Sequence, residues 1–331
     1  MTSHAIRAFA VTLVLAGLAE AGGSHYGITP GRRTTFEARV SEWPVPTPQF
    51  ARDPAPGPDG AIYIAVMQGN KVARFDPRAK TFKEWELPAG ARPHGLLVDR
   101  RGHVWYTGNG NGTIGQLDPA TGRVVSHKAP SGGDPHTLVI NDAHDTIWFT
   151  VQSAGRVGRL DTKTGAITEF KTRGNPYGIT LDREGHAWFC QLSGDRLGRI
   201  DAKTGAVTEV ALEAGSRPRR MATAPDGSIW VTYNGNGKLV RFDPAARRVV
   251  KEYRLPAGPE GAPYAVTVDG AGVVWANEIR HDTVVRIDPK TDELRVVKLP
   301  SDRVGIRKMI VDAEGRLWYM GSHNGRLGVI E

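Results

Sequence analysis

The chain has 331 residues, of which 40 are glycine and 22 are proline, so nearly one position in five favours a turn. This frequency excludes helical bundles and coiled coils, which need long uninterrupted periodic segments. Hydrophobic residues make up 40% and charged residues 24% of the sequence, which excludes wholesale disorder. The formal charge of +8 comes from 43 basic residues interspersed with 35 acidic ones, so we expect no nucleic-acid partner. A single cysteine, Cys190, excludes an intramolecular disulfide.

The N-terminus has the three parts of a secretory signal. A short basic segment precedes an apolar run over residues 8–19, and Ala19-Glu20-Ala21 matches an A-x-A cleavage pattern. The run is too short for a bilayer, which takes about 20 residues, and no other stretch is long enough, so we expect no membrane span. We therefore predict a signal peptide over residues 1–21, a periplasmic or secreted protein, and a loose lead-in over residues 22–35.

Seven copies of one pattern fill residues 36–331, which we predict to be a single domain. In each copy an aromatic residue follows a turn, and successive aromatics are 40 to 45 residues apart. An acidic residue comes thirteen positions later, at the end of an apolar segment; it is aspartate in six copies and the C-terminal Glu331 in the last. We expect the aromatic residues to pack between neighbouring repeats. They are Tyr63, Trp105, Trp148, Trp188, Trp230, Trp275 and Trp318.

Each copy divides into four short segments with strand character. In the second copy they cover residues 94–99, 103–107, 113–118 and 123–128, joined by turns that contain glycine. Four strands in a repeat of this length are typical of a propeller blade. The sequence therefore predicts an all-β fold, a seven-bladed β-propeller with four antiparallel strands per blade. The last copy lacks a fourth strand, and residues 38–44 resemble one, so we expect the N-terminal strand to close the ring.

The longer and more varied loops of such a propeller lie on one face, where they join successive blades and the two middle strands of each blade. We expect the functional site on this face, over the central channel. Its residues would come from the entry of each innermost strand and from the third position after each aromatic. The strand entries are His94, His136, Tyr177, Arg219, Tyr264 and Arg307, with Arg52 in the weaker first copy. We predict that the first six of these bind substrate together with Arg280.

Glu278 is the only carboxylate at the third position after an aromatic, and Arg280 and His281 follow it. A lone acid near a channel mouth is a general base, a ligand for a hard metal ion, or the partner of a nearby arginine. His94 and His136 either share a ligand or bond to the backbone at their blade entries. The arginines at the entries of blades five and seven favour a carboxylate or phosphate, or form a solvated basic rim.

Three motifs carry a family resemblance. The Pro-His-Gly and Pro-Tyr-Gly entries, the Trp-Phe-Thr and Trp-Phe-Cys strands and the following Gly-Arg-Leu-Asp or Gly-Arg-Ile-Asp resemble the virginiamycin B lyase (streptogramin B lyase) family over residues 36–331. The resemblance implies a monomeric seven-bladed propeller, a Mg²⁺ ion, and opening of a cyclic depsipeptide by elimination across an ester C–O bond. It also implies a site with a histidine in one blade, then a glutamate and a histidine two residues apart in the next. Glu278 matches the glutamate, whereas Tyr233 and Arg280 stand at the positions of the two histidines.

The resemblance leads to a first hypothesis, an exported, metal-assisted lyase that opens an ester or lactone C–O bond in a small-molecule or peptide-like substrate. Glu278 would be its catalytic acid/base or metal-bridging residue. Because arginine cannot be deprotonated, the base would be Glu278, Tyr233 or His281. The second hypothesis is a non-catalytic periplasmic propeller that binds an anionic ligand, and the third is an SMP-30-like lactonase. The basic rim of the second hypothesis comprises Arg219, Arg220, Arg280, Arg307 and Lys308.

Overall fold

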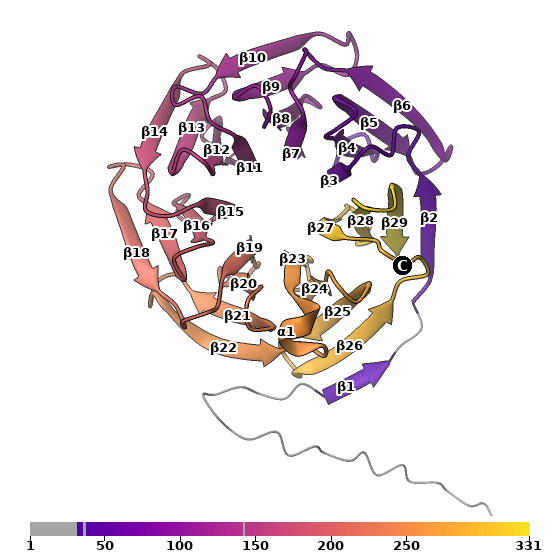
Figure 1. The fold of residues 1–331 in the computed structure, drawn as a ribbon, viewed down its shortest axis with the longest axis vertical. Helices are drawn as coiled ribbons and strands as arrows, with labels where there is room; N and C mark the ends of the chain where they lie inside the picture. Colours follow the sequence, from indigo (N-terminus) through magenta and orange to yellow (C-terminus); the bar gives the residue numbers. More distant parts are fainter. Residues whose placement is uncertain (1–31, 36–37, 142) are drawn as a thin grey trace, which may run out of the picture.

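A computed structural model describes residues 32–35, 38–141 and 143–331 of the chain. Seven β-sheets stand around a central axis (Figure 1), and in the first six the four blade strands run in chain order from the axis outwards. The four strands that make up each blade pair antiparallel with their neighbours, so the fold is the predicted seven-bladed propeller. The predicted signal peptide, residues 1–21, lies outside the described residues.

Each blade contributes one strand to each of four concentric layers. The innermost strands are β3 (Ala51–Pro56), β7 (Pro93–Val98), β11 (Pro135–Asn141), β15 (Pro176–Leu181), β19 (Pro218–Thr223), β23 (Pro263–Val268) and β27 (Ile306–Val311). The second strands are β4 (Ile62–Val66), β8 (Val104–Gly108), β12 (Thr146–Val151), β16 (Ala187–Gln191), β20 (Ile229–Tyr233), β24 (Val274–Glu278) and β28 (Leu317–Gly321). The third strands are β5 (Lys71–Asp76), β9 (Thr113–Leu117), β13 (Arg156–Asp161), β17 (Arg196–Ile200), β21 (Lys238–Asp243), β25 (Thr283–Asp288) and β29 (Arg326–Ile330). The outermost strands are β6 (Thr81–Glu86), β10 (Val124–Lys128), β14 (Ile167–Lys171), β18 (Val207–Ala211), β22 (Arg248–Arg254), β26 (Glu293–Lys298) and β2 (Val40–Pro44).

Two N-terminal strands attach to the last two blades. Strand β2 pairs antiparallel with β29 and takes the outer position of blade seven, which therefore contains both ends of the described propeller. Trp43 of β2 packs against Phe75 of blade one, with ring centroids 4.9 Å apart. Strand β1 (Arg32–Thr35) pairs in parallel with β26 as a fifth strand of blade six. The segment expected to be a loose lead-in over residues 22–35 thus contains a strand.

The repeated aromatic residues form the contacts between neighbouring blades, as the sequence predicts. Trp105 of blade two packs with Leu138 and Phe149 of blade three, and Trp188 of blade four packs with Val231 of blade five. Both indoles are fully buried. Burying an aromatic side chain stabilises a fold by roughly 1.5–3 kcal/mol, so the repeated interface is a main source of stability.

A carboxylate six residues before the aromatic residue fixes several indoles, a feature that the sequence pattern did not predict. Asp99 Oδ2 accepts a hydrogen bond from Trp105 Nε1 at 2.9 Å, and Asp99 Oδ1 accepts from the backbone N–H groups of Arg101 and His103. One side chain thus ties the short turn between the first two strands to the interface between blades. The same indole bond recurs in Asp182–Trp188 and Asp312–Trp318.

The acidic residue thirteen positions after the aromatic residue builds the turn between the third and fourth strands. Asp161 Oδ1 accepts hydrogen bonds from the backbone N–H groups of Lys163 and Thr164, both at 2.9 Å. These bonds favour the ionised carboxylate and lower the pKa of Asp161. Similar bonds lower the pKa of Asp201 to about 2. These short turns occupy one face of the propeller, called the turn face below, and the longer loops occupy the opposite, loop face.

The only helix in the described part of the chain is a single turn, α1 (Gly258–Gly261), in the loop between blades five and six. Its last carbonyl, that of Gly261, accepts a hydrogen bond from the backbone N–H of Arg280, so α1 lies beside the loop that follows β24. No helix among the described residues has the length and apolar character needed to cross a bilayer.

Candidate anion site in the central channel

Seven side chains meet near the axis where the innermost strands begin. Each is the second residue of its strand, so a register that repeats along the sequence becomes a ring in space. The imidazole centroids of His94 and His136 are 3.6 Å apart, and the Tyr177 ring follows at 4.2 Å from His136. The structure therefore brings together the residues predicted at the strand entries. This entry ring consists of Arg52, His94, His136, Tyr177, Arg219, Tyr264 and Arg307.

Two tyrosines and an arginine are closely joined within the entry ring. The hydroxyl groups of Tyr177 and Tyr264 form a hydrogen bond with each other. Arg219, from the blade between them, donates from Nη2 to both phenolic oxygens, at 3.3 Å and 3.4 Å. Its Cζ lies 4.7 Å and 4.2 Å from the two ring centroids. Because Arg307 Cζ is 5.3 Å from the Tyr264 ring as well, Tyr264 has a guanidinium group on each side.

The third residues of the innermost strands form a second layer below the entry ring. Arg220 Nη2 lies 3.4 Å from Asp53 Oδ2, and Arg220 Nη1 donates to Thr137 Oγ1 at 3.0 Å. Lys308 Nζ donates to the backbone oxygen of Leu96 at 2.7 Å. Asp53 is fully buried and Arg220 nearly so. Arg220, which the sequence placed on a basic rim, therefore lies inside the channel, paired with the one carboxylate of this layer.

The two layers carry a strong excess of positive charge. Burial lowers the pKa of His94 and of His136 well below the usual value, and nearby arginines lower both further, so both imidazoles are neutral at pH 7. Burial also lowers the pKa of Lys308 to about 8, which leaves it mainly protonated at neutral pH. Asp53 is the one carboxylate against five basic side chains. The five are Arg52, Arg219, Arg220, Arg307 and Lys308.

Several buried polar atoms of these layers have no hydrogen-bond partner among the described residues. They include Nε and Nη2 of Arg52, both ring nitrogens of His94, and Nε of Arg219, Arg220 and Arg307. A buried donor without a partner costs about 1–3 kcal/mol. Oxygen atoms of a ligand would relieve this cost.

Below the entry ring the channel holds a cavity of about 330 Å³. Inner-strand residues line it, among them Leu138, Ile179, Met221 and Met309, together with Arg220, Arg307 and Lys308. Its wall is thus largely apolar, with basic groups contributed by the second and third residues of the strands. Such a cavity matches a small ligand that combines an apolar body with an anionic group.

The predicted acid Glu278 makes its hydrogen bonds outside the entry ring. It ends β24 and is 2% exposed. Its Oε1 accepts from the backbone N–H of Ala257 at 2.6 Å, and its Oε2 accepts from the Thr283 hydroxyl at 3.0 Å. Among the described residues it has no ion pair with an arginine, so the ion-pair interpretation of Glu278 is not what the structure contains. Glu278 instead anchors the loop that carries α1.

The other predicted catalytic residues are also placed outside the entry ring. Tyr233 ends β20, and its hydroxyl is buried with no partner among the described residues. Burial, together with the carboxylates of Glu252 and Glu213, raises its pKa, so Tyr233 is a neutral phenol at neutral pH. Arg280 and His281 are exposed in the loop after β24, away from the buried ring. Their catalytic and binding roles stay predictions.

The loop face does not fit the Mg²⁺ ion that the family resemblance implies. Mg²⁺ prefers carboxylate and other oxygen ligands, but Asp53 is surrounded by cations and both oxygens of Glu278 accept hydrogen bonds. In the described residues, one group of three His, Cys, Asp or Glu side chains has ligand atoms close together, and it lies on the turn face. It consists of Asp182, Glu184 and His186.

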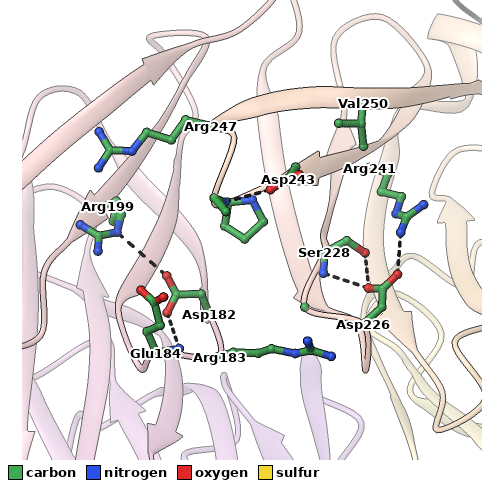
Figure 2. A pocket seen from close by; sticks show the side chains of 13 residues that line it. Asp182, Arg183, Glu184, Arg199, Asp226, Ser228, Arg241, Asp243, Arg247 and Val250 are labelled. Atoms are coloured by element: carbon green, nitrogen blue, oxygen red, sulfur yellow. Dashed lines mark hydrogen bonds and ion pairs between the residues drawn. The ribbon is translucent and has the colours of Figure 1, made fainter.

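A second hollow, of about 510 Å³, lies on the turn face between blades four and five (Figure 2). Figure 2 shows acidic and basic side chains together around this turn-face groove. Arg241 Nη2 lies 2.6 Å from Asp226 Oδ2, and Arg199 Nε lies 4.0 Å from Asp182 Oδ2. Solvent reaches the Arg241–Asp226 pair, whose side chains are 34% and 53% exposed, and Arg241 Nε is the one buried polar atom without a partner among the described side chains of the groove. We place the candidate site at the entry ring despite its smaller cavity.

Comparison with known proteins identifies the family. The model of the virginiamycin B lyase family matches residues 30–171 and 91–331, which together cover most of the chain. The chain belongs to the virginiamycin B lyase family. Comparison with curated proteins returns no match. The family's motifs thus carry over to this chain, with Tyr233 and Arg280 at two positions where the resemblance implies histidine.

Solved structures of lyases share the fold of this family member. A structure described as streptogramin B lyase is 24% identical, with a TM-score of 0.80 over 89% of this chain and 97% of the other. Virginiamycin B lyase from Staphylococcus aureus is 20% identical, with a TM-score of 0.81 over 89% and 99%. A catalytically inactive histidine-to-alanine variant of that enzyme, with quinupristin, is 21% identical, with a TM-score of 0.79 over 89% and 99%.

Proposed function

We propose that this member of the virginiamycin B lyase family is an exported propeller that binds the anionic group of a small-molecule or peptide-like ligand at the entry ring. The supporting observation is the group of five basic side chains around one carboxylate, Asp53, with buried donors that lack partners. Isolated buried charges cost several kcal/mol each, and a carboxylate or phosphate would offset this cost while accepting the free N–H groups. The signal-like N-terminus supports export to the periplasm or the outside.

The cavity below the ring adds a second property to the proposed ligand. Its apolar wall has room for a short hydrocarbon or aryl group, and Arg220 and Lys308 would contact an anionic end. A carboxylic acid with an apolar body meets both conditions, whereas a fully polar anion such as sulfate would use the cations alone. We therefore expect hexanoate to bind more tightly than acetate.

Calorimetric titration of residues 22–331 with acetate, hexanoate and hexanol tests the proposal. Hexanoate should bind in a salt-sensitive manner, and hexanol should not bind. The double variant Arg219→Met/Arg307→Met should lose about tenfold or more in affinity, because each charge-assisted bond is worth about 1.5–3 kcal/mol. The matched control is Arg241→Met/Arg247→Met on the turn face, which should bind as the unaltered protein does. Equal losses in both double variants, or no binding of either acid, would refute the proposed site.

Family membership favours a second candidate function, the opening of an ester or lactone C–O bond. The solved relatives are described as lyases, one of them with quinupristin. In this candidate Glu278 would be the essential acid/base residue, with its carboxylate held by the Ala257 N–H and the Thr283 hydroxyl. Because the loop face does not fit Mg²⁺, we expect any turnover to be the same with Mg²⁺ and with EDTA.

Mass spectrometry of quinupristin incubated with the protein tests the lyase candidate. A linear product that is absent with Glu278→Gln, while the variant keeps its melting temperature, would support it. An intact ring in all samples would remove the lyase candidate and leave the anion-binding proposal standing, since binding is measured separately. Turnover that needs Mg²⁺ would contradict the poor fit of the ion to the loop face.

A further inference from the structure

The entry ring holds a group that can itself become negative, the phenol of Tyr264. We infer that Tyr264 is the proton-exchanging residue of this site: its phenolate balances the buried cations when no ligand is bound, and it takes up a proton when an anionic ligand binds. The inference rests on the proposed anion site, and it adds that Tyr264 takes up a proton when the ligand binds.

The hydrogen bonds of the two tyrosines favour one missing proton. Arg219 donates to both phenolic oxygens, and the hydroxyl groups of Tyr177 and Tyr264 bond to each other. A single phenolic proton is enough for the bond between the hydroxyls. The second phenolic proton has no acceptor among the described residues, at a place where both rings are almost fully buried. Removing it costs no hydrogen bond and creates an oxyanion with two donors.

The surroundings of Tyr264 decide which group ionises. Burial alone raises its pKa, but the guanidinium groups of Arg52, Arg219, Arg220 and Arg307 outweigh burial and lower the pKa to about 7. Burial and the neighbouring Tyr264 raise the pKa of Tyr177, so Tyr177 keeps its proton and donates it. The other titratable or charged groups on the strands around Tyr264 are His94, His136, Asp53, Tyr233, Glu278 and Lys308.

The position of Arg219 connects ligand binding to this proton. Arg219 is the partly exposed member of the group, whereas Tyr177 and Tyr264 are buried. An anion that engages Arg219 competes with the Tyr264 phenolate for the same guanidinium, and two negative groups at one cation repel each other. Binding therefore raises the pKa of Tyr264, and the phenolate takes a proton from solvent. The affinity for a non-titrating anion then falls about tenfold per pH unit above the pKa of Tyr264.

Absorbance of tyrosinate in the ultraviolet, recorded against pH without ligand, tests the ionisation. One of the eight tyrosines should ionise near pH 7, about three pH units below the ordinary value. Tyr264→Phe should remove this early step and leave the later ones, and Arg219→Met should shift it upwards. The matched control Tyr233→Phe changes a buried tyrosine outside the ring and should keep the early step. The absence of any tyrosine ionisation below about pH 9 would overturn the inference.

A titration with sulfate, which stays a dianion over the whole pH range, tests the coupling. Above pH 7 sulfate should lower the tyrosinate absorbance, and its dissociation constant should rise about tenfold per pH unit. In Tyr264→Phe the same constant should be nearly independent of pH up to about pH 8, above which Lys308 also loses its proton. Sulfate binding without a change in absorbance would overturn the proton uptake and leave the anion site intact. Failure of sulfate and hexanoate to bind would overturn the anion site, whereas the ligand-free titration still decides the state of Tyr264.

Discussion

The turn-face groove and the entry ring both contain several arginines, but the arginines differ in how far they are exposed and in whether a carboxylate pairs with them. In the groove the side chains of Arg241 and Asp226 form an ion pair while 34% and 53% exposed. In the ring Arg52 is 6% exposed, and its Nε and Nη2 have no partner among the described residues. The groove is the larger hollow, at about 510 Å³ against about 330 Å³ for the channel. Uncompensated buried charge, more than size or the number of arginines, therefore marks the candidate site.

The two regions also differ in whether equivalent positions of the blades carry the same residue type. On the turn face the same residue types recur and do the same work, as Asp99 and Asp182 do for their indoles. At the entry ring an equivalent position is occupied by histidine, tyrosine or arginine, depending on the blade. Positions that keep one residue type in several blades thus stabilise the fold, whereas the position that varies from blade to blade forms the candidate site.

Among the substitutions considered in the two regions, Asp53→Asn should cause the largest loss of unfolding free energy. This substitution leaves Arg220 buried without its carboxylate, and breaking a buried ion pair costs about 3–5 kcal/mol. Urea denaturation should show this loss of unfolding free energy. Because the only carboxylate of the two layers disappears, affinity for hexanoate should rise at the same time. A loss below about 1 kcal/mol would mean that Arg220 reaches solvent and that the ring is less isolated than the structure indicates.

Arg52→Met should act in the opposite direction on stability. It removes a buried cation with two donors that lack partners, so we expect the unfolding free energy to increase by about 1–3 kcal/mol. The same variant should bind hexanoate more weakly, since one of the five basic groups is gone. Thermal denaturation and calorimetry together check the prediction. A variant that is both less stable and unchanged in binding would assign Arg52 a structural role.

The pH dependence of stability should separate the ring from the turns of the turn face. His94 and His136 have lowered pKa values in the folded protein, whereas the unfolded chain binds protons near pH 6.5. Their contribution is therefore complete above about pH 6.5 and declines as the pH falls, by up to about 1.4 kcal/mol per pH unit for each histidine. The turn carboxylates, such as Asp161 and Asp201, also have lowered pKa values, but they lose their contribution only below about pH 4.

Urea denaturation between pH 4.5 and 7 measures this slope in the unaltered protein and in His94→Gln. The variant should have a flatter dependence, because one group that takes up a proton on unfolding has been removed. Asp161→Asn is the matched control and should keep the full slope in this range. An unchanged slope in His94→Gln would mean that His94 is protonated in the folded protein.

The sequence predicted the blades because their determinants are local. Glycine turns, strand-length apolar segments and an aromatic residue every 40 to 45 positions recur within each copy. The residues of the entry ring were also predictable, since one register repeated seven times must converge at the axis. Trp105 and the other repeated aromatics pack between blades for the same reason.

The energetics of the site depended on contacts that no local pattern encodes. Tyr177 and Tyr264 are 87 residues apart, and Arg220 and Asp53 are 167 apart. Arg220 was predicted on a basic rim together with Arg219, whereas the structure pairs Arg220 with Asp53 inside the channel. Glu278 was predicted as a general base, a metal ligand or the partner of an arginine, whereas its backbone partner Ala257 comes from an irregular loop before α1. The sequence did indicate the cluster of basic residues at these entries, but not that Asp53 would be the one carboxylate beside them.

The smallest effect should come from Asp226→Asn in the turn-face groove, the counterpart of Asp53→Asn. Arg241 loses its ion-pair partner there too, but both side chains are exposed, and a surface pair is worth about 0–1 kcal/mol. The backbone bond from Ser228 to Asp226 Oδ1 can be kept by the asparagine oxygen, so the turn should survive. Urea denaturation should detect a change below about 1 kcal/mol, and calorimetry should detect none in hexanoate affinity. Arg241 would then lack its carboxylate without becoming an anion site, because its side chain is 34% exposed and water can solvate the charged group. Tighter hexanoate binding in Asp226→Asn would instead place an anion site in the groove and break the distinction between the two regions.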